Sequence, residues 1–243
     1  MPIHYLSCCL FLVLLSGCAG LKDFQSAREG NNLNFSRQGL SEFPEEAFLN
    51  PNLKVIRLYG NKIDSIPDRI GEFVNLEKLY LGKNNIRYLP KSISKLKKLK
   101  ILSIQYNDLV EIPSSIGGMV NLEQLLLNNN KLKTLPKTIG DLKKLEVLEL
   151  KYNGFEVLPD EIGECTELQF LKLNQNNILE IPYSLTNCRK LRELHLSGAG
   201  TILSLPEDLC TLRYFEVLEI DRIVTVPNCL MVLQTNRLSI IVR

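Results

Sequence analysis

The stretch that decides the fold is Leu76–Pro90, which reads LEKLYLGKNNIRYLP, and its pattern recurs along most of the chain. Leu122–Pro136 repeats the same skeleton as LEQLLLNNNKLKTLP. The prolines that close the repeats are spaced by 23 residues from Pro44 to Pro182, and then by 24 and 21 residues. They are Pro44, Pro67, Pro90, Pro113, Pro136, Pro159, Pro182, Pro206 and Pro227. A constant period of about 20–29 residues indicates a solenoid of stacked repeats.

Each repeat contains the pattern of a short strand followed by a turn. The Leu-x-Leu part has a period of two, which predicts a strand with alternate side chains facing inward. Strands of successive repeats then stack as a parallel sheet, about 4.8 Å apart, joined by right-handed crossovers. After each proline, apolar residues at the third and sixth positions predict a short 3₁₀-like turn on the opposite side. These apolar pairs run from Ile70 and Phe73 to Leu230 and Leu233.

The repeated Leu-x-x-Leu-x-Leu-x-x-Asn-x-Leu-x-x-Leu-Pro, with its tail Leu-Pro-x-x-Ile-Gly-x-Leu, resembles the 23-residue form of the leucine-rich repeat. The resemblance covers about residues 32–243 and leaves no stretch for a second domain. It implies an α/β fold, a right-handed leucine-rich-repeat solenoid with a curved parallel sheet on the concave face and short 3₁₀ or helical turns on the convex face. We expect about nine coils and a C-terminal cap, with a closing strand in 237–242. The resemblance also implies recognition by a rigid curved surface, without catalysis.

One column of asparagines holds the same place in successive repeats. Its members are Asn61, Asn84, Asn107, Asn130, Asn153 and Asn176. An amide side chain carries donors and an acceptor together, so it can satisfy backbone groups of its own coil and of the adjoining one where the chain leaves the strand. We therefore predict a structural role for this ladder. The column fails at Gln38 and again at Ala199 or Gly200, as expected of terminal repeats that cap a solenoid.

The first residues of the chain differ from the repeats. The apolar stretch Leu6–Leu15 is ten residues long, which fits a secretory signal better than a membrane span of about 20 residues. Leu15-Ser16-Gly17-Cys18 resembles the lipobox of bacterial lipoproteins, although MPIHY in front of it contains no Lys or Arg. This resemblance implies cleavage before Cys18 and attachment of lipid to its sulfur. The expected organisation is a signal peptide 1–17, a lipidated Cys and tether 18–31, and a leucine-rich-repeat domain 32–243.

Charge and composition argue against several classes of function. The net charge is only +2, and the basic cluster in 95–100 is interrupted by leucines, as on a solvated face, so we expect no nucleic acid partner. The only histidine after the signal is His195, and no cysteine shares its face. A metal site needs several ligands at suitable spacing, and His195 beside Glu193 does not supply them. We therefore expect no enzyme activity, no cofactor and no metal.

Four cysteines fall within the repeats. Cys165 and Cys188 occupy the column that elsewhere holds Leu, Met or Phe, which favours small core residues. A bridge between them is the alternative, because equivalent positions in adjacent coils are near neighbours. Cys210 and Cys229 lie outside this column, in the expected C-terminal cap, where export would permit a disulfide. The sequence leaves both pairings open.

The outward strand positions form columns on the expected concave face. Its central column is Asn34, Arg57, Tyr80, Ser103, Leu126, Glu149, Lys172, His195 and Glu219. Tyrosine and arginine are favoured anchors of interfaces, although tyrosine also simply suits an exposed strand. The predicted ligand-binding residues are Arg57, Tyr59, Tyr80, Lys83, Tyr106, Leu126, Tyr152, Phe170 and Lys172. The carboxylates of Glu149, Glu193, Glu219 and Asp221 at the other end favour a partner with a basic segment there.

Together these patterns predict a lipid-anchored protein of a bacterial cell envelope, in the outer membrane, whose concave face binds a protein ligand. A host surface protein is one such ligand if the repeats are displayed outside the cell. Two alternatives stay open. One is a periplasmic structural or assembly component of the envelope, and the other is a cytoplasmic signalling adaptor in which LSGC is a coincidence.

Overall fold

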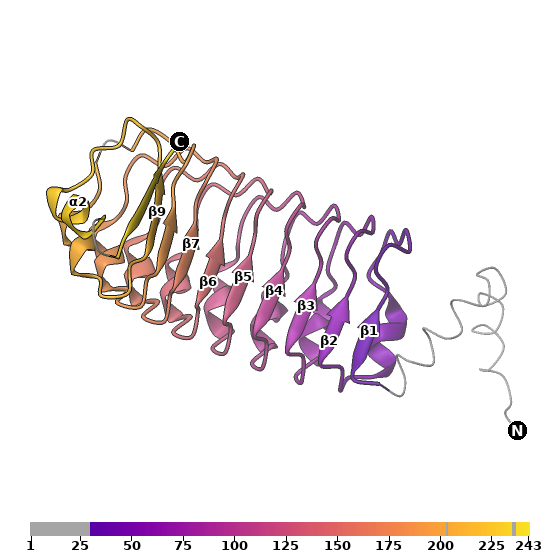
Figure 1. Ribbon diagram of the computed structural model, residues 1–243. Coiled ribbons are helices and arrows are strands. Elements are labelled where there is room, and N and C mark those ends of the chain that lie inside the picture. The colour runs from indigo at the N-terminus through magenta and orange to yellow at the C-terminus, as the bar shows by residue number, and fades with distance from the viewer. Residues whose placement is uncertain (1–29, 203, 235–236) are drawn as a thin grey trace, which may run out of the picture.

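The computed structural model describes residues 30–202, 204–234 and 237–243, and within them the chain winds into a curved solenoid (Figure 1). One ten-stranded sheet runs in chain order from β1 to β10, and all its strand pairs are parallel. The predicted leucine-rich-repeat solenoid is therefore confirmed. The predicted signal peptide 1–17, Cys18 and residues 19–29 of the tether lie outside the described residues. Among the described helices, none has the length and apolar character needed to cross a membrane.

The strands are short, and their register follows the sequence period. They are β1 (Asn32–Asn34), β2 (Val55–Arg57), β3 (Lys78–Tyr80), β4 (Ile101–Ser103), β5 (Gln124–Leu126), β6 (Val147–Glu149), β7 (Phe170–Lys172), β8 (Glu193–His195), β9 (Val217–Ile220) and β10 (Ser239–Val242). The middle residue of each three-residue strand is buried, and the residues beside it face outward. Leu33, Ile56 and Leu79 pair in register, so each coil adds one leucine or isoleucine to the same inner column.

Short 3₁₀ turns line the convex side. They are η2 (Glu45–Leu49), η3 (Asp68–Glu72), η4 (Lys91–Lys95), η5 (Ser114–Gly118), η6 (Lys137–Asp141), η7 (Asp160–Glu164), η8 (Tyr183–Asn187) and η9 (Glu207–Thr211). Each follows a proline, whose fixed φ and missing N–H suit the residue before a helical turn. The last coil has a full α-helix instead, α2 (Asn228–Gln234). Adjacent turns approach closely. At Gly163, for example, an added Cβ would clash with the backbone oxygen of Ser184 in the next turn.

The asparagine ladder fills the bends that follow β2–β7. Asn84 shows the pattern: its amide nitrogen donates to the carbonyls of Leu58 (3.0 Å) and Leu81 (2.8 Å), and its oxygen accepts from the backbone N–H of Ile63 (3.0 Å). One side chain therefore links two coils. Asn107 repeats this arrangement one coil further on, with Leu81, Ile104 and Ile86 as partners.

The cysteines of the repeats divide into one bridged pair and two thiols. Cys210 in η9 and Cys229 in α2 form a disulfide with a Cα–Cα distance of 5.8 Å. Cys165 and Cys188 are free and fully buried, and burial raises the pKa of each thiol to about 12. The disulfide thus connects the helix of the last coil to the turn before it, while the two thiols act as small apolar core residues.

Candidate ligand-binding face

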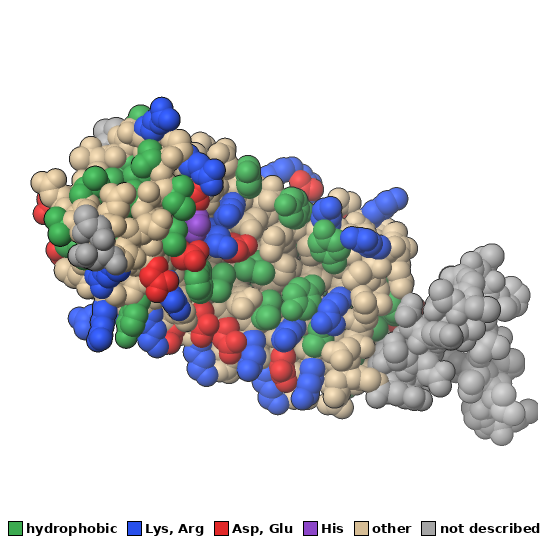
Figure 2. All heavy atoms as spheres, viewed as in Figure 1, with side chains coloured by type: hydrophobic (Ala, Val, Ile, Leu, Met, Phe, Trp, Pro, Cys, Tyr) green, Lys and Arg blue, Asp and Glu red, His purple; other side chains and the backbone are tan. Residues whose placement is uncertain are grey.

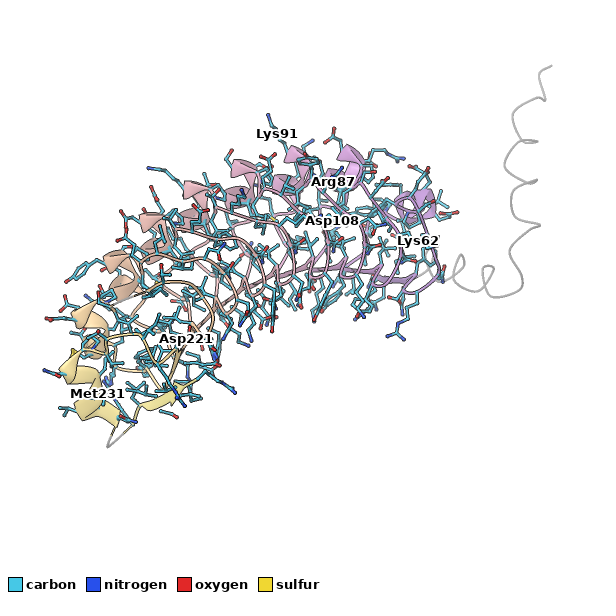
Figure 3. All side chains as sticks on the ribbon, turned by 90° about the horizontal axis from the view of Figure 1, so that it is seen from above. Lys62, Arg87, Lys91, Asp108, Asp221 and Met231 are labelled. Atoms are coloured by element: carbon cyan, nitrogen blue, oxygen red, sulfur yellow. A yellow bond between two sulfur atoms is a disulfide. The ribbon has the colours of Figure 1, made fainter. Side chains whose placement is uncertain are left out.

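The strands and the turns that follow them present four columns of side chains on the inner side of the arc. In Figure 3 the ribbon bends so that the helical turns, including the one that carries Lys91, lie outside and the sheet lies inside. The first column is Asn32, Val55, Lys78, Ile101, Gln124, Val147, Phe170, Glu193 and Val217, and the central column is the one predicted above. The third column is Ser36, Tyr59, Gly82, Gln105, Asn128, Lys151, Asn174, Ser197 and Asp221. The turn column is Arg37, Gly60, Lys83, Tyr106, Asn129, Tyr152, Gln175, Gly198 and Arg222.

The turn column has an unusual backbone conformation. Six of its residues are in the left-handed region although they are not glycine, with φ between 53° and 59°. They are Arg37, Lys83, Tyr106, Asn129, Tyr152 and Gln175. Gly60 and Gly198 take the same conformation at φ 75° and 64°. The bend lets the chain leave the strand immediately, and it projects the turn-column side chains beside those of the third column.

Tyrosine rings and cationic groups alternate over β2–β4. The Lys83 ammonium lies 5.8 Å from the ring centroid of Tyr59 and 5.9 Å from that of Tyr106, so it sits between two tyrosines. In the central column, the Arg57 guanidinium lies 5.4 Å from the ring of Tyr80. Such cation–π contacts contribute about 0.5–1 kcal/mol at exposed sites. Figure 2 shows the result as hydrophobic and basic side chains next to one another over these strands.

Gly82 makes room for this arrangement. A Cβ at Gly82 would lie 3.1 Å from the Tyr59 ring, closer than such contacts normally are. The missing side chain therefore allows the Tyr59 ring to lie across the neighbouring coil, toward Lys83. Tyr106 is 50% exposed and Tyr152 is 55% exposed, so their rings are available to a partner.

The C-terminal half of the face contains a polar network centred on Glu219. Its carboxylate lies 2.6 Å from Nδ1 of His195, accepts from Nε of Arg243 at 3.0 Å and accepts from Nδ2 of Asn174 at 3.3 Å. The other ring nitrogen of His195 lies 2.9 Å from Glu193. Burial alone would raise the pKa of Glu219, but the hydrogen bonds of these partners outweigh it and lower that pKa. The carboxylate is therefore held ionised within its own set of donors.

A second polar network lies nearer the middle of the face, in the coils of β5, β6 and β7. The Lys172 ammonium is 2.9 Å from Glu149, and the amide of Asn128 donates to the same carboxylate at 2.6 Å. Phe170 lies beside Val147 in the neighbouring strand, and it is only partly buried. Leu126 is likewise partly buried, between Ser103 and Glu149 of its column.

All nine predicted ligand-binding residues thus belong to these four columns, but they do not form a single cluster. Arg57, Tyr59, Tyr80, Lys83 and Tyr106 gather over β2–β4, and Lys172 belongs to the polar network instead. The sequence reasoning did not single out Asn128, Asn174 or Arg243. β10 pairs with β9 at a spacing of 22 residues, which places Ile241 opposite Glu219, and Arg243 follows two residues later.

Within residues 30–202, 204–234 and 237–243, no group of three or more His, Cys, Asp or Glu side chains is arranged to hold a metal ion. His195 is engaged by two carboxylates, and both free thiols are buried in the core.

Comparison with known proteins identifies the repeats. A model of the leucine-rich repeat region matches residues 50–133, and a leucine rich repeat model matches residues 143–199. A solved leucine-rich-repeat protein of Leptospira interrogans is 32% identical over 91% of this chain, with a TM-score of 0.81. The chain belongs to the leucine-rich-repeat family. This leucine-rich-repeat protein spans 56% of the length of the Leptospira chain.

Other leucine-rich-repeat structures are similar at lower identity. The leucine-rich repeat domain of the type III effector XopL is 26% identical, with a TM-score of 0.80 over 92% of this chain and 80% of that domain. The plant peptide hormone receptor RGFR1, solved in complex with RGF2, is 29% identical, with a TM-score of 0.66 over 74% of this chain and 31% of the receptor chain. An internalin of Listeria monocytogenes, at 18% identity and a TM-score of 0.75 over 90% of this chain and 62% of that one, shows the shared fold alone.

Proposed function

We propose that this protein binds a protein or peptide ligand on its concave face. The observation that carries the proposal is the row of Tyr59, Lys83 and Tyr106, in which rings and an ammonium alternate on a rigid sheet. The plant peptide hormone receptor that is 29% identical to this chain was solved in complex with RGF2, which supports a recognition role. A preformed surface loses little conformational freedom on binding, so contacts made by its aromatic side chains contribute more fully to affinity.

Apolar exposure on the same face supports the proposal. Leu126 and Phe170 occupy outward strand positions and keep part of their surface accessible. Covering apolar surface contributes about 25 cal/mol per Å², so these side chains gain from a partner and gain nothing from water. Tyrosine, with a large ring and a polar hydroxyl, is favoured at the centre of such contacts.

Replacing Tyr80 and Tyr106 together by alanine tests this function. We expect capture of partner proteins to fall about tenfold, because each ring supplies anchor area, while the melting temperature changes by less than about 3 °C. Capture is measured by cross-linking in native envelope and candidate host extracts, followed by mass spectrometry. The matched control replaces Tyr88 and Tyr214, which are 59% and 51% exposed outside the four columns. If both double variants captured partner proteins equally well, Tyr80 and Tyr106 would not anchor the ligand.

We further propose that the protein is exported and anchored by lipid at Cys18 in a bacterial envelope. The basis is the Leu15-Ser16-Gly17-Cys18 sequence after a short apolar segment. The Cys210–Cys229 disulfide supports export, because disulfides persist in oxidising compartments and are rare in the cytosol. The same bond disfavours the cytoplasmic adaptor.

Metabolic labelling with a palmitate analogue tests the anchor. Wild-type chain is expected to incorporate the label and to sediment with membranes, whereas Cys18→Ala is expected to lose both, since only a thiol at this position provides the lipid attachment. Cys165→Ala serves as the control, because it also removes one thiol and leaves the amino-terminal motif intact. Equal labelling of wild-type and Cys18→Ala chains would rule out this anchor.

A further inference from the structure

Charge is unevenly distributed over the concave columns. Across β1–β4 the four columns contain four cationic residues and no carboxylate, and the cations are Arg37, Arg57, Lys78 and Lys83. The columns are uncharged at β5. Across β6–β9 they contain four carboxylates, namely Glu149, Glu193, Glu219 and Asp221, beside Lys151, Lys172, His195 and Arg222. The face therefore has a cationic half and a mixed half.

The two halves also differ in whether their charges are already paired. Within the described ranges, neither an ion pair nor a side-chain hydrogen bond engages the four cations of β1–β4. Arg57 and Lys83 lie over tyrosine rings. An uncompensated group of like charges creates a local potential that attracts the opposite charge, and a guanidinium held beside a ring keeps donors for a carboxylate.

Every carboxylate of the mixed half, in contrast, has a partner within the protein. Glu149 is held by Lys172, Glu193 and Glu219 by His195, and Asp221 accepts the backbone N–H of Gly198 at 2.8 Å. A basic segment would have to displace these donors before it could bind. The acidic end therefore does not favour the basic partner that the sequence alone suggested.

We propose that the ligand contacts the half of the concave face formed by β1–β4 through an acidic segment, with Arg57 and Lys83 binding its carboxylates and Tyr59, Tyr80 and Tyr106 packing on its apolar parts. This inference rests on the proposed function and names the chemistry of its partner. A polypeptide is favoured over a sulfated polysaccharide because Val55 and Ile101 lie in the first column beside the cations. Aspartate and glutamate next to apolar residues match both features at once.

A displayed library of random 16-residue peptides, selected on the full chain in detergent, tests the inference. We expect enriched peptides to be rich in Asp and Glu. A synthetic enriched peptide should bind at least about tenfold more weakly to Arg57→Gln/Lys83→Gln, because two charge-assisted contacts are lost. Replacing the peptide's carboxylates by amides should weaken binding similarly, and added salt should reduce it.

The matched control is Lys91→Gln/Lys95→Gln, which removes the same charge from the convex turn η4 and is expected to leave the affinity unchanged. Enriched peptides that are neutral or basic, and that lose affinity with the Tyr80 and Tyr106 substitutions but not with the Arg57 and Lys83 substitutions, overturn the acidic partner and leave the proposed function standing. If no recovered peptide needs Tyr80 and Tyr106 for binding, both the acidic partner and the proposed function are wrong. Dextran sulfate binding that requires Arg57 and Lys83, without any such peptide, replaces the polypeptide by a sulfated polysaccharide.

Discussion

Asn84→Ala is expected to lower the free energy of unfolding by about 3 kcal/mol or more. The substitution leaves the buried N–H of Ile63 without its acceptor. It also removes one of the two amide donors to each of the carbonyls of Leu58 and Leu81, which keep Asn61 and Asn107, respectively. The orphaned N–H costs about 1–3 kcal/mol, and each of the two lost hydrogen bonds costs about 0.5–1.5 kcal/mol. For a chain of this length, the corresponding fall in melting temperature is about 6–12 °C. Thermal unfolding followed by circular dichroism measures it.

The neighbouring residue supplies the control. Asn85 is exposed and makes a single amide contact, to the carbonyl of Lys62 at 3.3 Å. Asn85→Ala removes the same chemical group one position away, and its effect on the free energy of unfolding is expected to stay below about 1 kcal/mol. If both variants had the same melting temperature, the ladder would not stabilise the stack of coils.

The second large effect is expected from Cys210→Ser/Cys229→Ser. The disulfide closes a loop across 19 residues of sequence separation, for which the entropy of the unfolded chain gives about 3 kcal/mol of stabilisation. Because this bond joins α2 to η9, we expect the loss of stability to appear first in the last coil. Hydrogen exchange of the amides in 224–234 should accelerate, and the melting temperature should fall.

Reduction provides an independent check on the same bond. Reductant should lower the melting temperature of the wild-type chain toward that of the double serine variant, and it should leave the variant unchanged. Cys165 and Cys188 are buried thiols, so the reductant has no second bond to break among the described cysteines. A wild-type chain that melts identically with and without reductant would contradict the stabilising role.

The repeat made the architecture predictable, because a constant period converts sequence distance into position in the stack. Tyr80 follows Arg57 by 23 residues, and the two residues are partners in adjacent strands. The same count placed the inner leucines and the asparagines. The last coil departs from the period, and there the short turn expected at Leu230 and Leu233 is the seven-residue helix α2 instead of a 3₁₀ turn.

The repeat pattern does not show which charged side chains are paired with one another. Glu219 and Asn174 are 45 residues apart and two coils distant, and their contact depends on side-chain conformations that a column does not specify. Sequence therefore placed acidic residues at one end without revealing that His195 and Arg243 already bind them. It likewise placed Arg57 and Lys83 on the face without revealing that they have no carboxylate partner among the described residues.

The left-handed bends of the turn column lower stability in order to place side chains on the surface. A non-glycine residue in this conformation costs of the order of 1 kcal/mol, and Lys83, Tyr106 and Tyr152 accept that cost where glycine would not. Gly60 and Gly198 hold the equivalent bends in other coils, so folding alone has no need of a long side chain there. An engineer seeking only thermostability would choose glycine at these three positions, and would erase side chains of the face on which we propose that the ligand binds.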